Sequence, residues 1–142
     1  MIWNVLKHFS PNENWGDPNK MDPKLLRMLD AYRGLLDEKI FISCGTQGLH
    51  VPNSLHYQGK AVDILFPSSK KSLFDCYLIA EKFNFTGIGL YPDWHYGGKK
   101  LGGMHLDLRV SDIAVRWIGI KEVDQTVYIA FNEQNLKATK LI

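Results

Sequence analysis

The chain has 142 residues, 17 of them basic and 15 acidic, which gives a formal net charge of +2. That length supports one hydrophobic core, so we expect a single domain over residues 1–142. The near-balance of charge gives no reason to expect nucleic acid as a partner, and no apolar run is long enough to span a membrane. The N-terminal residues lack the apolar core of a signal peptide, which predicts a protein made in the cytoplasm without an export signal.

The predicted elements follow one another as helices and short strands, without a repeat or a linker. Asp22 is a suitable N-cap and Pro23 a suitable first residue for an amphipathic helix over residues 23–37. Ser69 is predicted to open a second helix. Short strands are predicted at residues 39–45, 60–66, 86–91, 104–110 and 126–131, and the tail allows a short helical end. Two main helices against a small, mostly antiparallel sheet of four to five strands form an α+β fold.

One charged residue lies inside an apolar strand, Asp63 in the segment AVDILF. A buried carboxylate is costly unless it has a partner, and a metal ion is one of the strongest partners available. Strand alternation places Asp63 and His105 each on the polar face of its strand. The two side chains converge if these strands are neighbours, and a tight turn at Gly59 lets His56 fold back to the same point.

Two imidazoles and one carboxylate are a suitable ligand set for a catalytic zinc ion, because three protein ligands leave a fourth position for water. By spacing alone, simpler alternatives stay open: His56 as a solvated loop histidine and His105 as a hydrogen-bonded strand histidine. Cys44 and Cys76 form neither a disulfide framework nor a CxxC motif, so we expect two buried free thiols.

The segment SLHYQGKAVDI, residues 54–64, matches the pattern Ser-x-His-x-x-Gly-x-Ala-x-Asp. Together with TGIGLYP and MHLDLR, it resembles the D-alanyl-D-alanine carboxypeptidase-like zinc metallopeptidases. That superfamily includes phage L-alanyl-D-glutamate endolysins, and its fold recurs in the Hedgehog amino-terminal domain. The resemblance covers residues 8–117 and implies one zinc ion held by His56, Asp63 and His105, with Ser54 among the substrate-binding residues. It also implies a peptidase in which zinc-bound water attacks a bond involving a D-amino acid in the peptidoglycan stem peptide.

The general base departs from the family pattern. Many members carry an acidic residue three positions before the last histidine, where this chain has Gly102. Asp107, on the same strand face as that histidine, is the first replacement candidate, His95 the second and Asp93 the third. The alternatives are that Asp107 only orients a zinc-bound histidine or pairs with Arg109, and that the chain has no base.

The substrate arginine of the family is also missing. The family commonly writes Ser-Gly-x-Arg after the strand that precedes the motif, whereas this chain has SCGTQG, with Gln47 in the place of the arginine. A neutral amide cannot pair with a terminal carboxylate as a guanidinium does. Cleavage inside a chain, by an endopeptidase, is therefore favoured over carboxypeptidase activity unless another arginine, such as Arg109, takes the role.

Aromatic residues near the last predicted ligand suit a wall of the substrate site. Tyr91 and Trp94 lie at the start of the glycine-rich loop before that ligand, although Tyr91 fits a core position equally well. Trp117, in the segment VRWIGI, is expected in the core. His50 is expected on the surface, but it lies close enough to His56 in the loop to line the cleft.

These features predict a zinc-dependent cell-wall peptidase of the lysin type. The absence of a signal peptide fits a phage- or prophage-type lysin that leaves the cytoplasm through a membrane lesion, or a virion-borne enzyme. A zinc-stabilised binding module without hydrolytic activity is the alternative, because the acid is missing at Gly102 and a fold does not imply turnover. Hydrolysis of a D-amino-acid peptide outside the cell wall is a third hypothesis.

Overall fold

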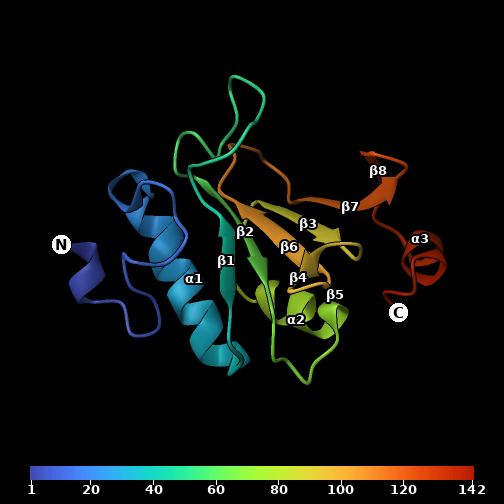
Figure 1. Cartoon of the computed structure of the whole chain (residues 1–142), viewed down its shortest axis with the longest axis horizontal. Helices are drawn as coiled ribbons and strands as arrows, with labels where there is room; N and C mark the ends of the chain where they lie inside the picture. The colour runs from blue at the N-terminus through green and yellow to red at the C-terminus, as the bar shows by residue number, and fades with distance from the viewer.

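The computed structural model describes residues 1–142 and has an α+β architecture (Figure 1). Its six-stranded mixed sheet has the order β1-β2-β6-β3-β7-β8, and β4 and β5 form a separate hairpin. The helices are α1 (Pro23–Leu36), α2 (Leu73–Ala80) and α3 (Glu133–Ala138). The strands are β1 (Phe41–Cys44), β2 (Ala61–Leu65), β3 (Gly87–Tyr91), β4 (His95–Tyr96), β5 (Lys99–Lys100), β6 (Gly103–Asp107), β7 (Val115–Glu122) and β8 (Gln125–Ala130). None of the helices has the length and apolar character that crossing a bilayer requires.

The α+β class is confirmed, but the predicted strand count is wrong. The main sheet has six strands instead of four to five, and β7 was not predicted. β7 pairs in parallel with β3 and antiparallel with β8, so it joins two predicted strands and makes the sheet mixed. Because β7 is buried only near its middle, its sequence lacks the clean alternation that identifies a strand half-covered by a core.

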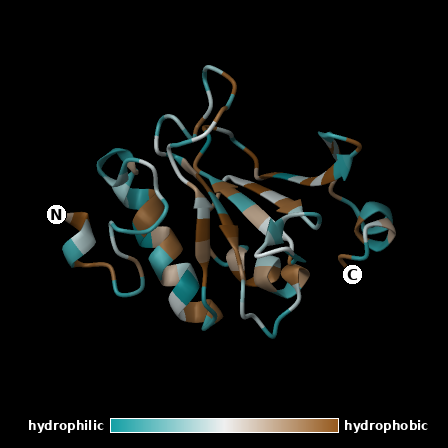
Figure 2. Ribbon diagram, viewed as in Figure 1, coloured by the Kyte–Doolittle hydropathy of each residue, from teal (hydrophilic) through white to brown (hydrophobic).

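The first helix forms as its sequence predicts. Asp22 accepts hydrogen bonds from the backbone of Lys24 and Leu25, and Pro23 occupies the first turn, where its missing N–H costs nothing. Figure 2 shows hydrophobic and hydrophilic segments alternating along α1, as expected for a helix that buries one face. The second helix begins later than predicted, because Ser72, and not Ser69, caps it by accepting from the backbone of Asp75.

The hydrophobic core fills the space between the two main helices and one face of the sheet. Val62, Ile64, Met104 and Leu106 point from β2 and β6 into this core. By the two-residue period of a strand, the intervening residues of β2 and β6 lie on the opposite face. That face carries the polar residues of the motifs, so the core holds the sheet rigid while leaving the other face for chemistry.

Candidate metal centre

Three predicted ligands come together on the polar face of the sheet. Asp63 on β2 lies directly opposite His105 on β6 in the antiparallel register, and the Nδ1 atom of His105 is 3.0 Å from Oδ1 of Asp63. The Nε2 atom of His56 is 3.4 Å from the same carboxylate oxygen. The three ligand atoms all lie within 4.8 Å of one another, so the residues form one candidate metal-binding group.

A tight turn before β2 carries His56 to the site. Gly59 ends this turn with φ +69 and lies so close to the backbone of Lys20 that a Cβ would overlap the carbonyl oxygen. Only glycine satisfies both conditions. The Nδ1 atom of His56 lies 2.9 Å from the carbonyl oxygen of Gly45, which only accepts hydrogen bonds. Nδ1 therefore carries a proton whether the ring is neutral or charged, and Nε2, facing Asp63, is the nitrogen that a metal would bind.

The second histidine is oriented by a buried carboxylate. The Nε2 atom of His105 lies 2.7 Å from Oδ2 of Asp107, which has no solvent exposure. Arg109 donates to the same oxygen through Nη2 at 2.6 Å and to Oδ1 through Nε at 3.0 Å. A carboxylate that fixes the outer nitrogen of a metal-binding histidine is the usual partner in such centres. Of the two roles considered for Asp107, this geometry matches orientation of His105 and pairing with Arg109.

Mutual hydrogen bonds set the protonation of the cluster. Burial opposes a positive charge on His56, but hydrogen bonds to Asp63 and Cys44 outweigh it and raise the pKa of His56 to about 10. Burial likewise opposes charge on Asp63 and His105, yet their hydrogen bonds lower the pKa of Asp63 and raise that of His105. Without a metal, protonated histidines therefore balance the carboxylates, and a cation that binds must displace those protons.

The residues fit zinc in both chemistry and spacing. Zinc commonly takes imidazole nitrogen and carboxylate oxygen at about 2.0–2.1 Å, which sets neighbouring ligand atoms of a tetrahedral site about 3.3 Å apart. The observed separations are 3.0 Å and 3.4 Å. The two nitrogen atoms turned toward Asp63 are the ones that their outer hydrogen bonds leave available.

The centre lies in a cleft of about 660 Å³ that has an aromatic wall. Tyr91 and Trp94 stack at 4.2 Å, and the indole nitrogen of Trp117 donates to the hydroxyl of Tyr91 at 2.9 Å. The guanidinium of Arg109 lies 4.8 Å from the ring centroid of Trp117. The core position expected for Trp117 is wrong, because its ring lies in this cleft over the space left by Gly89. Sequence reasoning also missed Tyr128 on β8, for which a partner strand had to be known first.

The other predicted site residues divide between the cleft and its surroundings. Ser54 lines the cleft, and its hydroxyl accepts a hydrogen bond from the backbone of His56 at 3.2 Å. Gln47 does not line it, since its amide is engaged by backbone groups of Asn14 and Gly45. Gln47 therefore holds the loop instead of facing a substrate.

Two candidates for the base lie outside the cleft. His95 is exposed on the β4–β5 hairpin, and Asp93 pairs with Lys100 at 3.0 Å. Gly102 cannot be replaced by an acid without strain, because its φ is +71 and its missing side chain would point toward Leu73. The structure brings the predicted metal ligands together with Asp107 and Arg109, but it brings neither His95 nor Asp93 to them.

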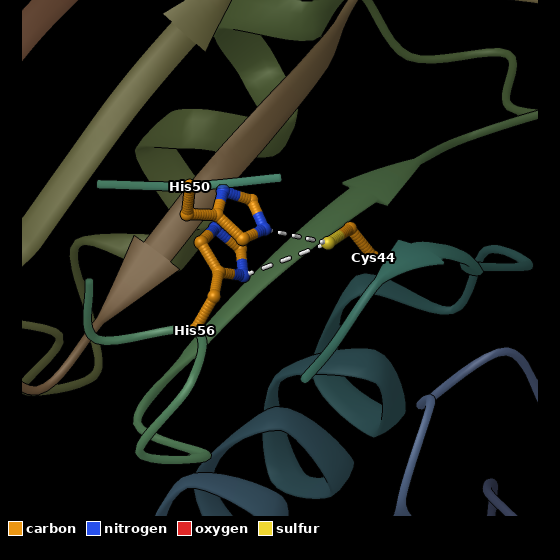
Figure 3. Close-up of side chains that lie close together, drawn as sticks. All are labelled: Cys44, His50 and His56. Carbon is orange, nitrogen blue, oxygen red and sulfur yellow. Dashed lines mark hydrogen bonds between the residues drawn. The ribbon is translucent and has the colours of Figure 1, made fainter. Parts of the chain in front are cut away.

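A second cluster adjoins the first and includes two residues that were not predicted as ligands. The Sγ atom of Cys44 lies 3.5 Å from Nε2 of His50 and 3.8 Å from Nδ1 of His56 (Figure 3). Cys76 is buried as expected, whereas Cys44 and His50 are half-buried, and His50 lines the cleft instead of lying on the open surface. The two histidines of this loop were the sequence signal that could have indicated the second cluster. The face on which Cys44 lies could not be predicted, because a bulge in β1 between Ile42 and Cys44 breaks strand alternation.

In comparisons with known proteins, no protein-family model and no curated protein sequence matches the chain.

Proposed function

We propose that this chain is a zinc-dependent peptidase that hydrolyses a bond involving a D-amino acid in the peptidoglycan stem peptide. The observation that carries the proposal is the His56, Asp63 and His105 cluster, whose ligand atoms face one another in an aromatic-walled cleft. The resemblance of the surrounding motifs to the D-alanyl-D-alanine carboxypeptidase-like peptidases supplies the substrate class.

Zinc, when bound, would supply Lewis acidity that activates water near neutral pH and polarises a peptide carbonyl. The chain's own residues prepare the position for it. Gly45 and Asp107 hold the outer nitrogens of the two histidines, which keeps the inner nitrogens turned toward Asp63. The aromatic wall supplies flat, partly polar surfaces against which a peptide or sugar can lie.

The charges of the cleft support cleavage within a chain. Arg109 is the guanidinium that lines the cleft, and its charge is already balanced by three hydrogen bonds to the carboxylate of Asp107. A terminal carboxylate would find no unpaired guanidinium there, whereas a neutral peptide carbonyl needs only a hydrogen-bond donor. Nη1 of Arg109, which takes no part in the bonds to Asp107, can provide that donor. We therefore propose an endopeptidase of the lysin type.

A second candidate function is a zinc-stabilised binding module without turnover. The position of the three candidate general bases favours it. Asp107 has no solvent exposure, and His95 and Asp93 lie outside the cleft. A peptidase needs a group that takes a proton from water and returns it to the leaving amine. The binding module needs only the cleft and the metal ligands.

Purified peptidoglycan distinguishes the two functions. We expect the zinc-loaded protein to release new amino groups, and mass spectrometry of the fragments to identify the bond that is cut. Chelation and Asp63→Asn should abolish release, while Asp112→Asn, which alters an exposed carboxylate that does not line the cleft, should not. A folded, zinc-loaded protein that binds peptidoglycan without releasing amino groups would refute the peptidase and establish the module.

A further inference from the structure

The second cluster, Cys44, His50 and His56, presents three atoms that bind soft and borderline metal ions. Its ligand atoms lie within 4.8 Å of one another, as those of the first cluster do. The rings of His50 and His56 stack at 4.3 Å with an interplanar angle of 8°. Because the rings are parallel, one nitrogen of each can face the thiol of Cys44 from the same side (Figure 3).

The spacing fits tetrahedral coordination. With Zn–S bonds of about 2.3 Å and Zn–N bonds of about 2.0–2.1 Å, a sulfur and a nitrogen ligand lie about 3.5 Å apart. The observed distances from the Cys44 sulfur are 3.5 Å to His50 and 3.8 Å to His56. A thiolate with two imidazoles selects thiophilic ions such as Zn²⁺, Cu⁺ or Cd²⁺ over the oxygen-seeking Mg²⁺ and Ca²⁺.

Separate structural features bring these residues to one place. The bulge between Ile42 and Cys44 breaks strand alternation and pairs Cys44 with Asp63, whose side chain belongs to the first cluster. The hydroxyl of Tyr57 holds the His50 loop, since it accepts from the backbone of His50 at 2.8 Å and lies 3.1 Å from the carbonyl of Gly48. His50 is thus held by the fold and is not a freely moving surface histidine.

Hydrogen bonds occupy the same atoms in this structure. The thiol of Cys44 and Nε2 of His50 both lie close to the carbonyl oxygen of Gln47, at 3.1 Å and 2.9 Å. Ligation by Cys44 would release its thiol proton to solvent, and ligation by Nδ1 of His56 would require the proton that now faces Gly45 to leave that nitrogen. The same imidazole offers its other nitrogen, Nε2, to the first cluster, so with both sites filled His56 would release the protons of both nitrogens to solvent and bridge the two ions as an imidazolate.

From this geometry we propose that Cys44, His50 and His56 form a second metal site, for a thiophilic d¹⁰ ion, which shares His56 with the first site. Because one imidazole serves both sites, an ion at either site changes the basicity and orientation of the ligand available to the other. The affinities of the two sites are therefore coupled.

Titration of the metal-free full chain with Cd²⁺ tests this site without reference to peptidase activity. A cadmium–thiolate bond produces an ultraviolet charge-transfer band that carboxylate and imidazole ligands do not produce. We expect this band in the wild type and in Cys76→Ala, the matched variant that removes the chain's other free thiol. We expect no band in Cys44→Ala, and in His50→Ala at least about a 10-fold weaker affinity, the lower end of what even an orienting residue contributes.

The coupling between the two sites through His56 is tested by the Cd²⁺ concentration at which the thiolate band develops. Asp63→Asn weakens the first site, so the thiolate band should remain and should develop at a different Cd²⁺ concentration from the wild type. Absence of the band from the folded wild type, or a band of unchanged affinity in Cys44→Ala or His50→Ala, would overturn the second site. Equal midpoints in Asp63→Asn and wild type would overturn the sharing of His56.

If circular dichroism shows that Cys44→Ala is unfolded, alkylation of the wild type provides an alternative test. In the wild type, Cd²⁺ should protect Cys44 from iodoacetamide, as measured by peptide mass mapping. Cys76 serves as the internal reference, because burial raises the pKa of its thiol to about 11 and its alkylation should be slow with or without Cd²⁺. Equal alkylation of Cys44 with and without Cd²⁺ would refute the site.

Discussion

Replacing Asp107 with asparagine separates the two roles that were considered for this carboxylate. The substitution keeps the size of the side chain but removes its charge and turns one oxygen into an NH₂ group. Oδ2 accepts from His105 and from Nη2 of Arg109, while Oδ1 accepts from Nε and the backbone N–H of Arg109. In either orientation of the amide, its NH₂ group faces donors, so hydrogen bonds are lost whichever way it turns.

The expected cost has two parts. Breaking a buried ion pair costs about 3–5 kcal/mol, and we expect about 3 kcal/mol in free energy of unfolding because Arg109 is partly exposed and can turn toward water. Loss of the residue that orients a metal-binding histidine lowers metal affinity by about 10- to 100-fold. At about 1.4 kcal/mol per factor of ten, that is about 1.4–2.8 kcal/mol of zinc binding.

Chelator competition measures the zinc affinity, and urea unfolding of the metal-free protein measures the stability. The matched control is Asp93→Asn, which removes a carboxylate that pairs with Lys100 outside the cleft and should leave zinc affinity unchanged. At saturating zinc, Asp107→Asn should recover peptidoglycan cleavage to within about 10-fold of the wild type, because an orienting residue does not itself carry the proton. An unchanged zinc affinity with a loss of cleavage of at least about 100-fold would refute this reasoning and make Asp107 the general base.

Three further predictions follow from packing and charge. Gly89→Ala places a methyl group where the indole of Trp117 lies, so it should destabilise the fold by about 1–3 kcal/mol and change the near-ultraviolet circular dichroism; an unchanged spectrum would contradict the contact. Tyr32→Phe removes a buried hydrogen bond of 2.7 Å to the carbonyl of Cys76 and should cost about 1–3 kcal/mol in urea unfolding; an unaltered midpoint would contradict this. The raised pKa of His56, about 10 against an ordinary 6.5, means that its contribution to metal-free stability is complete below pH 6.5 and is lost as pH rises toward 10. Urea unfolding across that range should show the decline in the wild type and a weaker decline in His56→Ala, and equal profiles would exclude His56 as its source.

The polar faces that carry Asp63 and His105 were predictable because strand periodicity is strict, and the family resemblance then singled out the whole cluster, His56 included. Alternation in two short segments placed Asp63 and His105 on polar faces, and the register then set them directly opposite each other. Only one fact about distant parts of the chain was needed, namely that the two strands are neighbours. The capped helix after Asp22 was predictable for a similar reason, since capping depends on residues a few positions apart.

The second cluster and the far side of the cleft depend on information that local patterns do not contain. A bulge shifts the register by one residue, so alternation counted through Ile42 gives the wrong face for Cys44. Trp117 is a large apolar residue in an apolar segment, which favours a core position. Only the parallel pairing of β7 with β3 places it beside Gly89, over the cleft. In both cases, tertiary pairing decided where an apolar or soft side chain went.

The two glycines of β3 explain why that strand lies beside the metal centre. Gly87 and Gly89 pair with Asp107 and His105 of β6, the residues that form the orienting pair. A Cβ at Gly87 would overlap the carboxylate of Asp107, and one at Gly89 would overlap the ring of Trp117. The absence of side chains at Gly87 and Gly89 therefore makes room for the carboxylate that orients His105 and for the Trp117 ring in the cleft wall. Because closely packed groups occupy that space, substitution at either glycine should disturb the candidate metal centre without altering any of its proposed ligands.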